Sequence, residues 1–154
     1  MKKRTIVCLA AAGVLAVFAL TCVVLFRPKP LTDPAAEPVF LAAYVWPDGY
    51  ESRVPLDLTG KEEALLTCLK EYDRQRTTEQ LFQRSAGVAI PQWVQVEILI
   101  DDGAELYHLL LGQDACQRRA GLGYGGPVDR VLEGERLRET LWSLLEVEDL
   151  LRPA

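Results

Sequence analysis

The pattern of apolar and polar residues divides the chain into a long apolar segment, a proline-rich segment and a region of short mixed elements. No charged residue occurs over Thr5–Phe26, a run of 22 residues. As a helix this run would extend about 33 Å, enough to span a hydrocarbon core about 30 Å thick. Four prolines follow within residues 27–38, which favours a semi-rigid extended chain. The predicted order is a cytoplasmic N-terminus over 1–4, a transmembrane anchor over 5–26, a proline-rich stalk over 27–38 and an extracytoplasmic domain over 39–154.

Basic residues flank the apolar segment on both sides and decide its predicted orientation. Three precede it (Lys2, Lys3 and Arg4) and two follow it (Arg27 and Lys29). This difference narrowly favours a cytoplasmic N-terminus, with the following domain outside the cell. Two alternatives remain for this segment. One is a cleaved signal peptide, for which residues 17–19 form a weak small-residue site, and the other is lipidation at Cys22, which lacks the usual preceding residues.

The remaining sequence predicts strands from period-two alternation and from aromatic and β-branched residues. A first strand is expected over 39–46 and a second over 50–58. Because Pro55 has no N–H, the second strand lies at a sheet edge or has its proline on the unpaired side. Residues 93–100 alternate, Asp101-Asp102-Gly103 carries a turn signal, and residues 106–111 return as the partner strand of a hairpin. Residues 74–89 are expected to be irregular. Short strands are also expected near 79–83 and 130–132.

Two helices are predicted from apolar residues at helical spacing. Thr59 and Glu62 fit a capping box for a helix that ends near Asp73. Its expected apolar face consists of Leu65, Cys68, Leu69 and Tyr72. A second helix is expected over about 135–147. The predicted fold class is α+β: a transmembrane helix followed by a small antiparallel sheet packed with two helices.

The charge distribution changes the picture of what the domain could bind. The chain as a whole has a formal net charge of −5, but no acidic residue precedes Asp33. Residues 31–154 contain 12 basic and 22 acidic residues, a net of −10. A domain this acidic repels phosphate backbones, so nucleic-acid binding is not expected.

One glycine-rich segment satisfies the GxGxxG spacing of dinucleotide-binding loops. Its residues are Gly121, Gly123, Tyr124, Gly125, Gly126 and Pro127. The fingerprint needs a hydrophobic strand before it and a helix opening within it, whereas Gln117-Arg118-Arg119 precedes it and a proline follows. We therefore interpret 121–127 as a flexible loop that crosses the sheet, and expect no cofactor.

Candidate catalytic residues are few. His108 is the chain's single histidine and lies in phase with Leu106 and Leu110, which favours a structural role on a sheet face. Asp101 and Asp102 are not surrounded by the spaced oxygen ligands of a cation-binding loop. The three serines, Ser52, Ser85 and Ser143, lack the context of a nucleophile elbow. The sequence therefore predicts no catalytic or metal-binding residues and no enzyme activity.

Cys68 and Cys116 are the two cysteines of the predicted outer domain. Outside the cytoplasm they could form one disulfide, closing a loop of about 48 residues that stabilises the fold by roughly 4 kcal/mol on the chain-entropy model. The alternative is a pair of buried free thiols, because Cys68 lies on an apolar stripe. Both alternatives stand equally at this point.

The order of features over 39–147 resembles a family of small bacterial domains of unknown function. The matching parts are a first hairpin, a helix, the Ser85–Pro91 stretch before the strand over 93–100, Tyr107 in the return strand, and Tyr124-Gly125-Gly126-Pro127. Members of that family are membrane-anchored or secreted in Gram-positive bacteria. The resemblance implies architecture and location only, since the family has no assigned catalytic residues.

These observations lead to one main hypothesis and two alternatives. The main hypothesis is a single-pass protein of the cell membrane that presents an extracytoplasmic binding domain to an envelope protein, through its sheet surface or the 121–127 loop. The first alternative is a cell-envelope enzyme or enzyme accessory protein that uses Asp101, Asp102 or His108. The second is a purely structural envelope spacer.

Overall fold

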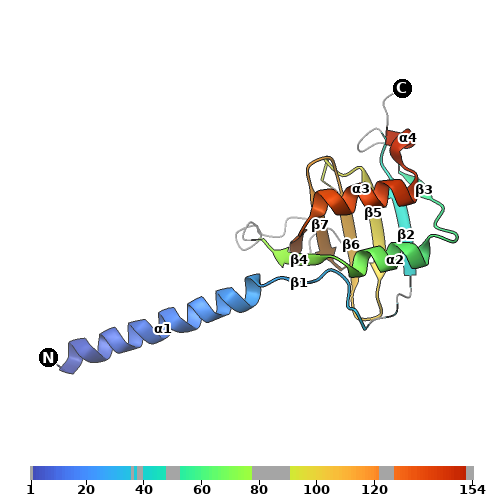
Figure 1. Cartoon of the computed structure of the whole chain (residues 1–154). Coiled ribbons are helices and arrows are strands. Elements are labelled where there is room, and N and C mark those ends of the chain that lie inside the picture. Colours follow the sequence, from blue (N-terminus) through green and yellow to red (C-terminus); the bar gives the residue numbers. More distant parts are fainter. Residues whose placement is uncertain are drawn as a thin grey trace.

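The computed structural model describes residues 2–35, 37, 40–47, 53–77, 91–121 and 127–151 (Figure 1). Within α1, side chains are described from residue 11 onward. The predicted strand over 79–83 and the Ser85–Ile90 part of the family resemblance lie outside the described residues. The first half of the predicted strand over 50–58 also lies largely outside them.

Helix α1, Lys2–Phe26, projects away from the rest of the molecule (Figure 1). Among the residues that the structure describes, no helix has both the length and the apolar character needed to cross a membrane. This finding contradicts the predicted transmembrane anchor over 5–26, and with it the predicted single-pass location in the cell membrane.

The proline-rich segment after α1 joins the sheet, which differs from the predicted stalk. Strand β1, Lys29–Pro30, pairs antiparallel with β4, Asp73–Arg76. Leu31 is buried, and its N–H donates to the carbonyl of Tyr72 at 2.8 Å. Because Pro30 has no N–H to donate, a position at the edge of the sheet suits it.

The sheet has eight antiparallel strands in the order β1-β4-β8-β7-β6-β5-β2-β3. The further strands are β2 Phe40–Val45, β3 Val54–Leu56, β5 Val96–Asp101, β6 Leu106–Leu111, β7 Cys116–Ala120 and β8 Val128–Val131. The β5–β6 pairing confirms the predicted hairpin, and the position of β3 confirms the predicted edge strand with Pro55. The predicted fold class, a small sheet with two helices and a membrane anchor, is therefore corrected: the described residues form an eight-stranded sheet and four helices.

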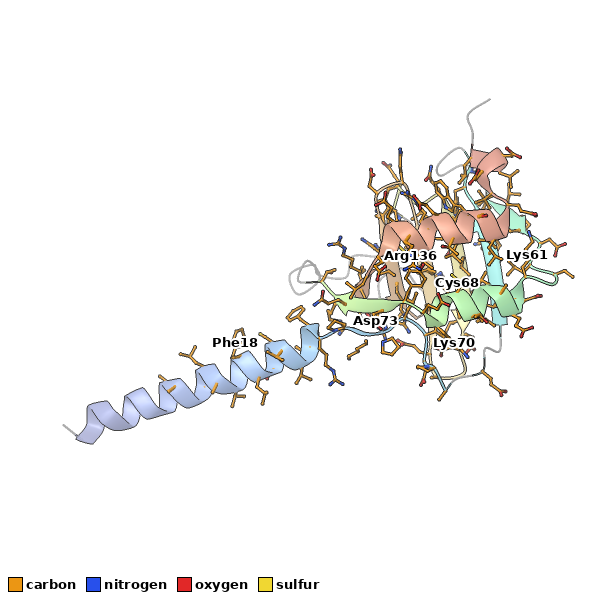
Figure 2. The ribbon with its side chains drawn as sticks, in the orientation of Figure 1. Phe18, Lys61, Cys68, Lys70, Asp73 and Arg136 are labelled. Carbon is orange, nitrogen blue, oxygen red and sulfur yellow. The ribbon has the colours of Figure 1, made fainter. Side chains whose placement is uncertain are left out.

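Helices α2 (Glu62–Lys70) and α3 (Gly134–Leu145) lie side by side over one face of the sheet (Figure 1). Their buried leucines meet alternate residues of β5 and β6 in one core. The central members of this core are Leu65, Leu69, Leu137, Leu141, Val96, Ile98, Ile100, Tyr107, Leu109 and Leu111. Burying a side chain of this size stabilises a fold by about 1.5–3 kcal/mol. Lys61, which lies at the start of α2 (Figure 2), forms an ion pair of 2.7 Å with Glu146 at the end of α3.

The ends of these helices differ from the prediction. The capping box is wrong: Asp57 accepts both the N–H and the hydroxyl of Thr59, at 3.0 and 2.7 Å, and the N-cap residue is Lys61. Helix α3 stops at Leu145 because Glu146 takes a left-handed conformation, with φ of 57°. A short helix, α4 Glu148–Leu151, then follows.

Ion pairs connect the polar strands β4, β7 and β8. Arg74 and Arg76 both bind the buried carboxylate of Asp129, Arg76 through its Nε at 3.1 Å. On β7, Arg118 binds Glu105 at 2.7 Å and lies 3.9 Å above the ring centroid of Tyr107. These contacts replace the apolar packing that β4 and β7 lack, which is why the alternation pattern did not predict either strand.

Gly112, directly after β6, is a position where the backbone approaches another residue closely. A Cβ there would lie 2.3 Å from the carbonyl oxygen of Trp93 and 2.6 Å from its Cε3. We expect Gly112→Ala to lower the free energy of unfolding by about 1–3 kcal/mol, since backbone must shift to admit the methyl group. Urea denaturation of the purified chain measures this change.

Gly13→Ala is the matched control, because a Cβ at Gly13 meets no atom within 4 Å. The control is expected to leave the domain's stability unchanged. Equal stability of the Gly112→Ala variant and the original protein would contradict the close approach.

Candidate functional site

The turn between β6 and β7 separates two cavities. The N–H of Gly112 donates to the carbonyl of Ala115 at 2.8 Å and closes the turn. One cavity has a volume of about 410 Å³ and the other about 540 Å³, and three residues line both: Gln113, Asp114 and Ala115. We call the two cavities together the turn cleft.

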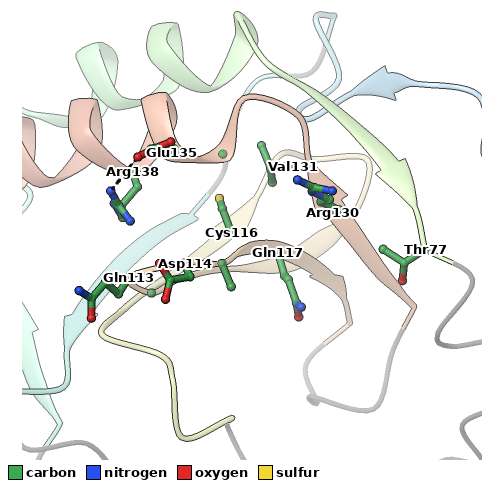
Figure 3. Close-up of a pocket in the computed structure, with 12 residues that line it drawn as sticks. Thr77, Gln113, Asp114, Cys116, Gln117, Arg130, Val131, Glu135 and Arg138 are labelled. Atoms are coloured by element: carbon green, nitrogen blue, oxygen red, sulfur yellow. Dashed lines mark ion pairs between the residues drawn. The ribbon is translucent and has the colours of Figure 1, made fainter.

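The first cavity, here the polar cavity, lies between the start of α3, the start of β7 and the end of β8 (Figure 3). Cys116 points toward the start of α3, and Gln117 points away from it. Arg138 lies 3.9 Å from Glu135 and 4.0 Å from Glu139, and its guanidinium carbon lies 5.2 Å from the ring centroid of Trp142. The Nε of Arg138 and the Oε1 of Gln117 are buried and make no hydrogen bond to any described residue.

The start of α3 is held against β7 by a glycine. A Cβ at Gly134 would lie 2.7 Å from the Cβ of Cys116, so a larger residue would push the helix away from the strand. Glu133, the residue before it, has a left-handed φ of 53°. This local geometry turns the chain sharply from β8 into α3 and forms one wall of the polar cavity.

The second cavity, here the aromatic cavity, is lined by Trp46 and Trp93 together with amide side chains. Both indoles are half-buried and pack against a small apolar cluster of Val94 and Leu110. The backbone of Gln95 joins the two tryptophan segments, since its carbonyl accepts the N–H of Trp46 at 2.9 Å. The side-chain Oε1 of Gln95 is buried and has no hydrogen-bond partner among the described residues.

Cys68 and Cys116 are both free thiols in the structure, which is the unbridged alternative. Cys116 is buried, and burial raises the pKa of its thiol to about 12. Burial, with a smaller contribution from the charge of Glu71, also raises the pKa of the Cys68 thiol, which lies on α2 near Arg136 of α3 (Figure 2). At neutral pH both groups are protonated, so neither is an activated nucleophile.

The residues of the enzyme alternative have structural contacts. Asp101 accepts the N–H of Gly103 at 2.9 Å, and Asp102 accepts those of Ala104 and Glu105 at 3.0 and 2.8 Å, which fixes the β5–β6 turn. His108 Nδ1 lies 2.8 Å from Glu97 Oε1, with both side chains buried. Ser143 lies exposed on α3, and Ser52 and Ser85 lie outside the described residues.

Only the two ends of the predicted interaction loop are described. Gly121 has a φ of +87°, and its N–H donates to the carbonyl of Leu106 at 2.8 Å. Pro127 is exposed, and its carbonyl accepts the N–H of Ala120 at 3.3 Å. Gly123, Tyr124, Gly125 and Gly126 lie outside the described residues. Among the residues described, no group of three or more metal-binding side chains comes together.

Sequence reasoning missed the residues that line the turn cleft. Trp46 comes directly after β2, and Trp93 shortly precedes β5. Because Val45 pairs with Val96 in an antiparallel ladder, these two strand ends must meet. The two tryptophans at the ends of neighbouring predicted strands were therefore the signal that could have located the aromatic cavity.

Comparison of the chain with protein families, curated proteins and solved structures finds no match. The resemblance to small bacterial domains of unknown function therefore stays a prediction.

The burial of Cys116 predicts its reactivity. In the folded protein at pH 8, we expect iodoacetamide to leave Cys116 unmodified, because almost none of it is thiolate and its side chain is covered. After unfolding in urea the same residue should react fully. Peptide mass spectrometry of protein purified without reductant reads out each cysteine separately, and a Cys68–Cys116 linked peptide would contradict the free-thiol arrangement.

Proposed function

We propose that this chain is a binding domain without catalytic activity and that its ligand occupies the turn cleft. The observation that carries the proposal is a pair of buried polar atoms in its walls that find no hydrogen-bond partner among the described residues: Gln95 Oε1 and Arg138 Nε. Leaving such an atom unsatisfied costs about 1–3 kcal/mol. A ligand that supplies the missing hydrogen bonds recovers this free energy on binding.

The size of the cleft supports the proposal. Small-molecule sites in proteins usually occupy about 300–1,000 Å³ and combine apolar walls with a few fixed polar groups. Each of the two cavities falls in this range, at about 410 and 540 Å³. The cleft is also preformed, because Gly112 and Gly134 hold its walls by close backbone contacts.

The enzyme and spacer alternatives receive less support. Asp101 and Asp102 use their carboxylates to fix a turn, and His108 is buried against Glu97. A pure spacer gives no reason for two adjoining cavities with unsatisfied polar walls.

The proposal predicts that small molecular fragments bind at the turn cleft. We expect a library of neutral and charged fragments, added to ¹⁵N-labelled full-length protein, to shift amide signals of residues 92–95 and 112–117. Ala115→Phe should abolish these shifts, because Ala115 lines both cavities and a phenyl ring there fills their common part.

Ala104→Phe is the matched control, since Ala104 is exposed in the β5–β6 turn and lines neither cavity. It should bind fragments as the original protein does. If no fragment shifts the signals of the cleft, or if both variants behave alike, the cleft is not a ligand site.

A further inference from the structure

We infer that the aromatic cavity binds a neutral, hydroxyl-rich saccharide; this inference rests on the proposed function and names the ligand class for one half of the turn cleft. A sugar ring has an apolar face formed by its C–H groups and an edge formed by its hydroxyls. The cavity offers a matching surface for each, as its lining residues show.

The apolar surface comes from the indoles of Trp46 and Trp93. Both line the cavity, and both are supported from behind by the buried side chains of Val94 and Leu110. A supported aromatic ring loses little conformational entropy when a ligand packs on it. Large, rigid aromatic faces with polar neighbours are suited to amphipathic ligands such as sugar rings.

The polar surface consists of three amides and one carboxylate, Gln92, Gln95, Gln113 and Asp114. Amides both donate and accept hydrogen bonds, and so do hydroxyls. The buried Oε1 of Gln95 and the carboxylate of Asp114 only accept, so the ligand must present donors to them. Sugar hydroxyls supply such donors at several points around one ring.

The same lining argues against two other ligand classes. Proline-rich peptides dock in aromatic grooves, but proline has no N–H, and such a peptide offers carbonyl acceptors to a site that needs donors. Anionic ligands are disfavoured because Asp114 lines the cavity and its described lining residues include no lysine or arginine. Neutral saccharides present donors and carry no negative charge, so they meet both requirements.

The test uses tryptophan fluorescence of the full-length protein carrying Trp142→Phe, which leaves the two indoles of the cavity as the only tryptophans. The probes are four neutral tetrasaccharides (cellotetraose, chitotetraose, maltotetraose and mannotetraose), a proline-rich decapeptide and tetragalacturonate. At least one neutral tetrasaccharide is expected to change the emission saturably. The decapeptide and tetragalacturonate are expected to cause no change.

Gln95→Leu and Gln117→Leu form a matched pair of variants. Each removes a buried amide oxygen without a described partner, but Gln95 lines the aromatic cavity and Gln117 does not. We expect Gln95→Leu to weaken saccharide binding about fivefold or more while leaving thermal stability equal or higher, because an unsatisfied acceptor is removed. Gln117→Leu should leave saccharide binding unchanged.

The outcomes separate the two proposals. If no neutral saccharide binds while fragments still shift the cleft signals, the saccharide inference is overturned and the binding function stands. Saturable binding of the decapeptide or of tetragalacturonate alone would also overturn it. Equal affinity of the Gln95→Leu variant and its parent would remove Gln95 from the site and overturn the donor argument. If neither fragments nor saccharides bind, both proposals fail.

Discussion

The ion pairs of the Asp129 carboxylate are the interaction that fixes the position of strands β4 and β1 in the sheet. The carboxylate is buried and binds Arg74 and Arg76, which come from the neighbouring strand β4. A buried charge is tolerated only when it is paired, and removing one partner from such a group typically costs several kcal/mol. The pairing therefore fixes β4 beside β8, and through β1 it attaches the segment that follows α1 to the domain.

The turn cleft depends on this placement. Strand β8 leads through Glu133 and Gly134 into α3, so the position of β8 sets where the helix begins. Gly134 then brings the helix start onto Cys116 of β7, and Gly112 brings the other end of the same turn onto Trp93. Two glycines thus close the backbone around the β6–β7 turn, and the two cavities are what remains on its two sides.

The parts of the fold that the sequence predicts are those held by apolar contacts. The β5–β6 hairpin follows from strict alternation of residues such as Val96, Ile98 and Ile100, whose side chains all enter one core. Strands β4 and β7 have no such alternation, because Arg74, Arg76 and Arg118 are held by ion pairs with residues far along the chain. A period-two pattern cannot show a partner that only the tertiary structure supplies.

The candidate site could not be predicted from the sequence for a related reason. Its residues come from the segments around Trp46, Trp93, Asp114, Arg130 and Arg138, which the antiparallel order of the strands brings together. The apolar run over 5–26 gave a wrong prediction of another kind. Its length and lack of charge predicted a membrane anchor, but none of the described helices has the length and apolar character to cross a membrane.

The wall of the turn cleft differs in kind from the core that supports it. In the main core, leucines and isoleucines are covered completely, and each contributes to stability. Around the cleft, Gln95 of its wall and Gln117 of the neighbouring strand β7 bury amide oxygens without described partners, which lowers stability. Replacing both by leucine should be neutral or favourable for folding alone. A buried amide oxygen that lowers stability, such as that of Gln95 in the cleft wall, is therefore better explained by recognition of a ligand than by the needs of the fold.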